Sequence, residues 1–475
     1  MPKKYQFLLY PLLLNSVLLP PLKADKPLVS PKLIEILRQY KPEMLQEGIE
    51  LRPSGEELQQ ALFEGDTSLI QKIATSKEST NIVQNFAEIE VYQSKGAFQE
   101  ANRQLEICNK NFFQDKNAQD LLSPINGILL TCSQMLIGNY FLEGDIKNWG
   151  IELNLIENVY YPAIQKFKGL EKFSLAVTKM GNLTISPDSI PPFTVTGIEQ
   201  QQSVPLQFQI PIEEIYRRNA EKLPSIIASL NKEDIPFFLE TGAAIGKLPT
   251  KFSHASNVHL IGHINNADNA ASENYSGELG IVEELKIGNA TLKNVPFLFT
   301  NVNQAYLGLM ILQKLGKIKI DKQKMIFGKN VNCICQQDVH FGITFKGDHQ
   351  VLKYPFYWKN KRNFAAIDLT QNNIDYDILT FKDKFLKNQQ NHFFDVTNNV
   401  DGTKIKNPAY FTESNLSIDG IDYGKKKELV IKDTIRNPST IIGAFILDKG
   451  SLYLDFINHK ACLMPDESDT QPMPQ

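Results

Sequence analysis

The chain of 475 residues lacks the motifs that most often reveal a protein's chemistry. It has no P-loop, no glycine fingerprint for dinucleotides, no ligand spacing typical of zinc and no Gly-x-Ser-x-Gly turn. Its net charge is only −3, so no basic surface for nucleic acid is indicated. Hydrophobic residues make up 42% and charged residues 22%, which is an ordinary globular composition. The length leaves room for about two to four domains.

Cysteine is scarce. There are five cysteines, namely Cys108, Cys132, Cys333, Cys335 and Cys462. An exported protein can oxidise some of them, and the odd number leaves at least one thiol free or bonded to another chain. A bridge from Cys462 to Cys333 or Cys335 is one interpretation, and unpaired thiols are the other.

Long hydrophobic runs are also rare. The one candidate is "MPKKYQFLLYPLLLNSVLLPPLKADKP", with two lysines, an apolar run and then a small residue. This pattern predicts a secretory signal peptide over residues 1–24 that ends at Ala24, and a secreted or periplasmic protein. The run is short and broken by prolines, so it suits a membrane span poorly, although an uncleaved N-terminal anchor is the alternative. No later segment is apolar enough to span, so we expect no membrane span after signal removal.

Seven histidines are present, and three of them lie close together at His254, His259 and His263. No acidic pattern accompanies them, and zinc sites usually have a cleaner ligand spacing. We therefore expect no metal and no cofactor.

Residues 30–178 have a helical pattern. "SPKLIEILRQY" begins with a Ser-Pro helix start, and two amphipathic segments then flank a turn at Lys95-Gly96. A similar pattern surrounds Gly144. These segments loosely resemble tetratricopeptide-type helical hairpins, which implies a concave face for a protein partner. A plain helical domain without a partner is the alternative.

From about residue 180 the pattern changes to short strands. Prolines cluster in "SPDSIPPFTV", and apolar residues then recur with period two. The segments expected as strands are "GNLTI", "PLQFQI", "SIIASL", "PFFLE", "ELKIG", "PFLFT", "KIKID" and "KMIFG". The period-two pattern of short strands continues to residue 463. We predict two β regions, 180–331 and 336–463, and a disordered tail over 464–475.

The two β regions share four landmarks in the same order. An apolar run ends in an acid, a Leu-x-Ile strand enters a turn, an apolar strand reaches a glycine, and an apolar-x-apolar strand ends in Asp. The acids are Glu240 and Asp368, and the glycines are Gly308 and Gly443. The acid-to-glycine separations are 68 and 75 residues, and the glycine-to-Asp separations are 13 and 12. This agreement predicts an internal duplication. Two unrelated β domains with similar hairpin turns are the alternative.

"FFLETG" followed by "AYLGLMIL", and "FAAIDLT" followed by "TIIGAFIL", resemble the aspartic protease superfamily, both retropepsin-like and pepsin-like. The resemblance covers roughly residues 205–463. It implies two β lobes related by a pseudo-twofold axis, with one acid from each lobe at the floor of a cleft. The predicted fold class is therefore multidomain, with an N-terminal all-α, helical-repeat-like domain and an all-β, two-lobed aspartic-protease-like domain.

The resemblance implies that Glu240 and Asp368 are the catalytic pair. It also implies that Thr241 hydrogen-bonds across to the other lobe, and that the backbone of Gly242 approaches the carboxylates where a side chain would not fit. Glu240 departs from the family, whose acid is Asp. The additional methylene moves the carboxylate by about 1.5 Å, which is comparable to a displacement that costs about a hundredfold in rate.

The second copy departs further from the family pattern. Leu369 replaces a threonine and removes a hydroxyl, and Thr370 replaces a glycine and adds a branched side chain. The resemblance assigns Gly308 and Gly443 to the strands that pack across the acid loops. A flap is expected within "HLIGHINNADNAASENYSGELGIVEE", with Tyr275 as the candidate flap residue. A simple surface loop is the alternative for this segment.

Three hypotheses follow. The first is a degenerate peptidase that binds extended peptide between its lobes with weak or no hydrolysis. The second is an active endopeptidase in which Glu240 and Asp368 share a proton and activate a water molecule. The third is a helical scaffold for protein interactions with the β domain as a spacer. The partner is thus a peptide or protein, and solvated turn acids are the alternative to any dyad.

Overall fold

The structure is a computed structural model of the whole chain. It describes residues 52–77, 81–114, 124–160, 181–212, 222–230, 232–268, 274–332, 335–343, 350–358, 361–371, 375–382, 393–398, 404–432 and 439–465. The predicted signal peptide lies outside the described residues. The first two residues of the predicted tail, Met464 and Pro465, are the end of a strand, and the rest of that tail lies outside the described residues.

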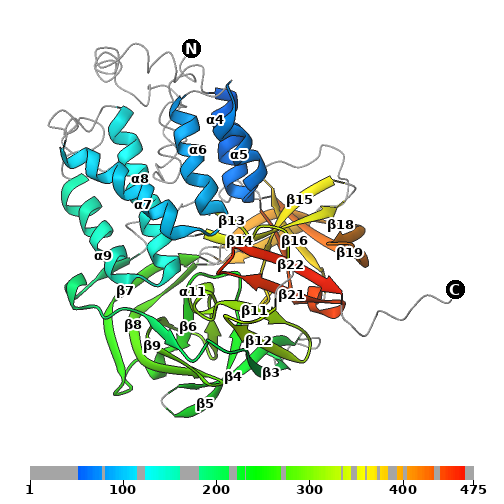
Figure 1. Cartoon of the computed structure of the whole chain (residues 1–475). Coiled ribbons are helices and arrows are strands. Elements are labelled where there is room, and N and C mark those ends of the chain that lie inside the picture. Colours follow the sequence, from blue (N-terminus) through cyan, green and yellow to red (C-terminus); the bar gives the residue numbers. More distant parts are fainter. Residues whose placement is uncertain are drawn as a thin grey trace.

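The N-terminal part is helical and packs above the β-rich remainder (Figure 1). Its elements are α4 (Arg52–Glu64), α5 (Thr67–Thr75), α6 (Asn81–Ser94), α7 (Phe98–Gln114), α8 (Pro124–Glu143), α9 (Ile146–Leu155) and the π-helical turn η2 (Ile156–Tyr160). The helix-turn-helix units expected around Gly96 and Gly144 are present. Both glycines have φ values near +70°, at 74° and 72°, which glycine adopts without the steric cost of a side chain.

The first β unit follows the helices. Its elements are β1 (Gly181–Leu183), η4 (Pro187–Ser189), β2 (Thr194–Thr196), β3 (Gln202–Gln209), β4 (Leu223–Leu230), β5 (Glu233–Leu239), β6 (Gly246–Pro249), η6 (Thr250–Phe252), β7 (Val258–Asp268), β8 (Asn274–Ile287), β9 (Ala290–Thr300), β10 (Ala305–Leu307), α11 (Leu309–Lys314), β11 (Lys317–Ile320) and β12 (Lys324–Gly328). Each of the eight segments expected as strands contributes to one of these strands.

The second β unit contains the remaining elements. They are β13 (His340–Ile343), β14 (Gln350–Trp358), β15 (Lys361–Ile367), β16 (Ile378–Lys382), β17 (Phe393–Asn398), β18 (Lys404–Ile418), β19 (Ile421–Lys432), β20 (Ser439–Ile442), η7 (Ala444–Asp448), β21 (Gly450–Asp455) and β22 (Lys460–Pro465).

The strand pairing of the first unit recurs in the second. In the first unit β5 is parallel to β10, β10 is antiparallel to β6, and β6 is parallel to β9. In the second unit β15 is parallel to β20, β20 is antiparallel to β16, and β16 is parallel to β19. Even the additional pairing of β4 with β8 has its counterpart in β14 with β18. The pairing therefore follows the duplication predicted from the four sequence landmarks.

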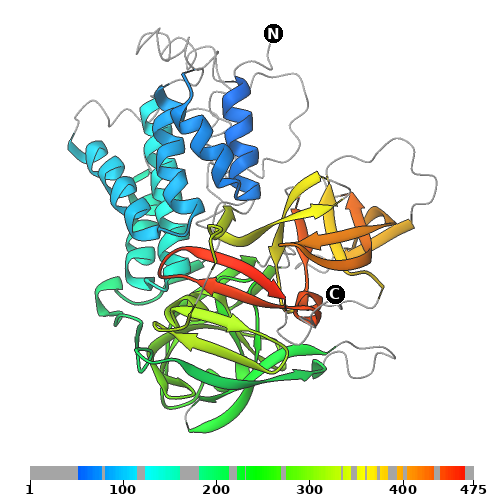
Figure 2. The same ribbon diagram turned by 45° about the vertical axis from the view of Figure 1, so that its right-hand side comes forward.

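The two units are joined through their closing hairpins. Strand β11 pairs antiparallel with β21, so that Ile318 faces Leu454 and Ile320 faces Leu452. In Figure 2 the red hairpin β21–β22 lies between the green first unit and the yellow and orange second unit. The C-terminal hairpin thus extends the sheet of the first unit, although the sequence boundaries placed it with the second.

The helical part contacts both β units. Phe98 in α7 packs edge-on against Phe341 in β13 with ring centroids 5.2 Å apart. On the other side, Gln313 Nε2 of α11 donates a hydrogen bond to the Leu142 carbonyl at 3.3 Å. One continuous cluster of buried apolar side chains includes residues of the helices and of both units. Helices α7–α9 and the two β units therefore share one core, whereas α4–α6 and part of the second unit have smaller clusters of their own.

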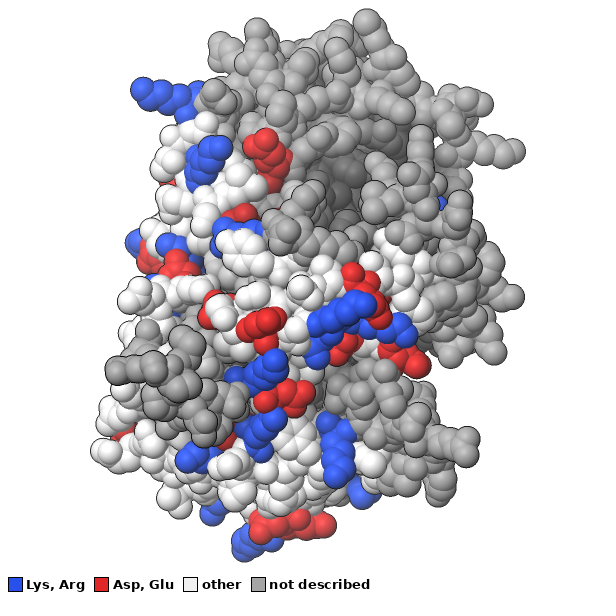
Figure 3. Space-filling view, turned by 90° about the vertical axis from the view of Figure 1, so that its right-hand side faces the viewer, with Lys and Arg blue, Asp and Glu red and all other residues white. Residues whose placement is uncertain are grey.

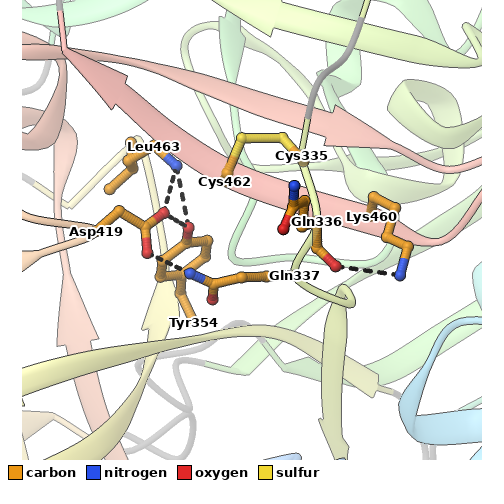
Figure 4. The surroundings of a disulfide bond; sticks show 8 residues. All are labelled: Cys335, Gln336, Gln337, Tyr354, Asp419, Lys460, Cys462 and Leu463. Carbon is orange, nitrogen blue, oxygen red and sulfur yellow. Dashed lines mark hydrogen bonds between the residues drawn. A yellow bond between two sulfur atoms is a disulfide. The ribbon is translucent and has the colours of Figure 1, made fainter.

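A disulfide links the segment before the first strand of the second unit to the last described strand of the chain. Cys335, just before β13, is bonded to Cys462 in β22 (Figure 4). Next to it, the Leu463 N–H donates to Asp419 Oδ2 at 2.8 Å and to Tyr354 Oη at 3.0 Å. Of the two interpretations of the cysteines, pairing of Cys462 with Cys335 is the one that the structure adopts.

Charged side chains of both signs are mixed on the face seen in Figure 3. Within the described residues, no helix has both the length and the apolar character that a membrane crossing requires.

Candidate active site

Glu240 and Asp368 occupy equivalent positions in the two units. The Glu240 N–H donates to the Leu307 carbonyl at 2.9 Å, and the Asp368 N–H donates to the Ile442 carbonyl at 3.0 Å. Each acid directly follows a strand that runs parallel to the strand supplying this carbonyl. The fold therefore places both acids at the same point of a repeated backbone arrangement.

Gly308 and Gly443 explain why the acid loops are so tightly held. A Cβ on Gly308 would lie 2.5 Å from the carbonyl carbon of Ile245, and one on Gly443 would lie 1.8 Å from the Gln371 carbonyl oxygen. Both distances are far below any van der Waals contact. Each glycine thus lets its strand pass directly against the loop that carries the acid of its unit.

The two acid loops touch each other across the units. Thr241 Oγ1 donates to the Ile367 carbonyl at 2.8 Å and accepts from the Leu369 N–H at 3.0 Å. A Cβ on Gly242 would lie 2.3 Å from Asp368 Oδ2, so the first loop reaches the second carboxylate by its backbone. Only the first loop supplies a hydroxyl for these bonds, because Leu369, the residue after Asp368, has none.

Asp368 is buried, with 2% of its surface exposed. Its Oδ1 accepts hydrogen bonds from the Thr370 N–H at 2.9 Å and from Thr370 Oγ1 at 2.7 Å. Thr370 therefore holds one carboxylate oxygen through both its backbone N–H and its hydroxyl. The other oxygen faces Gly242.

Glu240 forms a buried ion pair with Lys247. Lys247 Nζ lies 2.5 Å from Glu240 Oε1, and the two residues are only 3% and 1% exposed. An ion pair this far from water is strongly interdependent, because removing either partner leaves a buried charge without compensation. The negative charge of Glu240 is thus balanced within its own unit, by a residue seven positions further along the chain.

Two aromatic rings enclose the Lys247 ammonium. Nζ lies 3.6 Å from the ring centroid of Tyr275 and 4.8 Å from that of Tyr306. Both distances are within the range of cation–π attraction. Tyr306 faces Lys247 across the β10–β6 pairing, whereas Tyr275 comes from the hairpin of β7 and β8. The segment expected to be a flap or a surface loop is this hairpin.

Sequence reasoning missed Lys247. The strand registers place Leu379 at the equivalent position of the second unit, since Lys247 faces Tyr306 and Leu298, and Leu379 faces Ile441 and Leu429. A signal was available: a lysine within the apolar run "AAIGKLP" needs a buried partner of opposite charge.

The histidine group does not form a site. His259 Nε2 lies 2.9 Å from Glu283 Oε1, and both side chains are more than half exposed. Among the described residues, no group of histidine, cysteine, aspartate and glutamate side chains is arranged to hold a metal ion.

Comparisons with known proteins identify part of the first unit. A family model described as aspartyl protease matches residues 226–326, which include Glu240 and Lys247. Among solved structures, basic 7S globulin from soybean is similar with 9% identity and a TM-score of 0.36, covering 59% of this chain and 98% of that one. A retropepsin-like aspartic protease from Rickettsia conorii is similar with 17% identity and a TM-score of 0.19, covering 29% of this chain and 94% of that one.

No curated protein matches the chain. The family match lies entirely within the first β unit and leaves the helices unmatched. The chain therefore contains an aspartic-protease-like domain.

Proposed function

We propose that this protein is an aspartic-protease-like protein with a degenerate site, which binds extended peptide between its two β units with weak or no hydrolysis. The buried Lys247–Glu240 ion pair is the observation that carries the proposal.

Hydrolysis by an aspartic dyad depends on one proton shared by two carboxylates. One carboxylate acts as a base toward water while the other donates its proton to the substrate carbonyl. Like charges about 3 Å apart cannot both ionise, and the shared proton relieves this repulsion. Here the Lys247 ammonium already balances the negative charge of Glu240 without a shared proton.

The contacts that bring the acid loops together are nevertheless retained. Thr241 bonds to the second loop on both sides of Asp368, and Gly242 lies against its carboxylate. Retained architecture with altered acid chemistry favours binding over turnover. An extended peptide suits such a site, because strands offer it main-chain hydrogen bonds.

We further propose that the protein is exported. The N-terminal signal pattern motivates this, and the Cys335–Cys462 disulfide supports it, since such bonds persist mainly in oxidising compartments.

An active endopeptidase is the second candidate, favoured by the closeness of Gly242 to the Asp368 carboxylate. In that case Lys247 would have to release Glu240 when substrate binds. The endopeptidase should cleave peptides and lose this activity on Asp368→Asn, whereas the degenerate protein should bind peptides without cleaving them.

The first prediction tests this choice. The native protein should bind unstructured peptides in fluorescence anisotropy but release no fragments from them in mass spectrometry, from acidic to neutral pH. The variant Glu240→Asp/Lys247→Leu/Leu369→Thr/Thr370→Gly should gain cleavage, because it restores the family residues and removes the countercharge. Asp368→Asn in that background is the matched control and should abolish the gain. Cleavage by the native protein that disappears on Asp368→Asn would instead establish the endopeptidase.

A further inference from the structure

The hairpin formed by β7 and β8 reaches beyond the sheet that supports it. Pairing of β8 with β9 begins at Glu278, whereas pairing of β8 with β7 continues outward to Tyr275 and Asn274. Residues 274–277 thus have strand pairing with β7 only, and a side-chain bond from β9, in which Thr300 Oγ1 donates to the Ser276 carbonyl at 2.6 Å. Strands that extend beyond their sheet in this way open at low energetic cost unless side-chain contacts hold them.

The outer end of β8 is connected to the acid loop by a chain of contacts through Tyr275. The Tyr275 ring lies 3.6 Å from Lys247 Nζ, and Lys247 Nζ lies 2.5 Å from Glu240 Oε1. The ammonium is 3% exposed, so water screens neither contact well. Displacing the hairpin would expose the ion pair on the side that Tyr275 now covers. The closed hairpin and the ion pair therefore stabilise each other.

We propose that Lys247 is a positioning residue that fastens the β7–β8 hairpin over Glu240, so that peptide enters only when the Tyr275–Lys247 contact opens. The consequence for peptide entry rests on the proposed function, whereas the fastening itself does not. Leu379, the equivalent residue of the second unit, has no charge, so this fastening contact occurs in the first unit.

The second prediction tests this fastening by hydrogen exchange on the ligand-free full chain, followed at the amides of residues 275–279. Tyr275→Leu removes the ring, and Lys247→Met/Glu240→Gln removes both charges without leaving either one buried and unbalanced. Each variant should speed exchange at these amides by about tenfold, a factor that a poorly hydrated cation–ring contact supports. Tyr275→Phe keeps the ring face and should stay within about threefold of the native rate.

Lys293→Met is the matched control, because Lys293 joins Glu284 in an exposed pair between β9 and β8, away from the outer end of β8. It should leave the exchange unchanged. Native exchange rates in Tyr275→Leu or in the double variant would overturn the proposal, and so would equal acceleration by Tyr275→Phe and Tyr275→Leu. Peptide binding is measured separately: a protein that binds no peptide but shows the expected exchange pattern refutes the proposed function and keeps the fastening.

Discussion

At the scale of single residues, the site is distinguished by the buried positive charge of Lys247 beside Glu240. A lengthened acid at Glu240 alone would leave two carboxylates to share a proton. Lys247 supplies a positive charge 2.5 Å from Glu240 Oε1, in a place that water barely reaches. Under the proposed function, Glu240 and Lys247 therefore act together as one buried ion pair.

The third prediction concerns the stability of this ion pair. Lys247→Met should lower the free energy of unfolding by about 3–5 kcal/mol, since it leaves the Glu240 charge buried and unbalanced. Lys247→Met/Glu240→Gln should recover most of that loss. Chemical denaturation measures both. Lys293→Met, which breaks an exposed pair, is the control and should cost less than about 1 kcal/mol. Equal losses for Lys247→Met and Lys293→Met would show that the Lys247 pair is not buried in solution.

The residues of the site could be predicted from sequence only where a backbone requirement was involved. Gly308 and Gly443 were recognisable because each directly follows an apolar strand at a repeated distance from an acid. The contact between Gly242 and Asp368 was implied only by the resemblance. Lys247 could not be paired with Glu240 from sequence, because a lysine near several acids does not reveal which one it meets once the strands have paired. Tyr275 was named as a flap residue, but its contact with an ammonium was not foreseen.

At the scale of elements, the positions of strands in the sequence were more predictable than their pairing in the sheets. Period-two patterns marked the strands, and repeated landmarks marked the duplication. The pairing of β21 with β11 was not predictable, because apolar-x-apolar strands fit either sheet equally well. Disulfide pairing was equally open, since spacing alone does not choose among cysteines.

The fourth prediction concerns the contact between α5 and β13. Thr67 Oγ1 lies 3.0 Å from His340 Nδ1 in a buried position. Burial, reinforced by the nearby Arg362 guanidinium, lowers the pKa of His340 to about 4. Because the folded state disfavours the charged imidazole, the contribution of neutral His340 to the free energy of unfolding is fully present above about pH 6.5. It is lost as the pH falls toward 4, by up to about 3 kcal/mol.

His340→Gln should therefore flatten the fall in unfolding free energy between these pH values. His259→Gln, at an exposed histidine, is the control and should keep the native slope. Burial also raises the pKa of Glu90 in α6 to about 8. Glu90 therefore increases the stability of the fold as the pH falls from 8 to 4.5, whereas His340 decreases it. The slope difference between native protein and variant isolates His340 from this effect. Identical slopes for the two histidine variants would mean that His340 is not buried neutral.

At the scale of the whole molecule, the helices are part of the same folded body as the β units. Gly144 shows how close the parts lie, since a Cβ there would be 2.7 Å from the Phe193 ring. Phe98 and Thr67 contact the second unit, while Leu142 contacts α11 of the first. These helical faces are therefore used for internal packing and are not open to a partner. This packing gives no support to a separate helical scaffold.

The last prediction is that the helices and the β units unfold in one transition. The chain has two tryptophans, Trp149 in α9 and Trp358 in β14, and both are buried. Trp358→Phe leaves a fluorescence reporter in the helices, and Trp149→Phe leaves one in the second unit. Trp358 Nε1 donates to Glu428 at 3.0 Å, so Trp358→Phe lowers stability by itself. Each variant is therefore compared with its own far-ultraviolet circular dichroism rather than with the other variant.

In both variants the fluorescence and circular dichroism midpoints in denaturant should coincide, as a shared core requires of a two-state transition. Full-length protein with an intact Cys335–Cys462 disulfide is used, because reduction would free the ends of the second unit and could separate the transitions for an unrelated reason. An earlier midpoint for Trp149 alone would make the helical part an independent domain. In that event the contacts of Phe98, Thr67 and Leu142 would be a docking interface, and the helical part could leave the β units while their hairpin remained closed over Glu240.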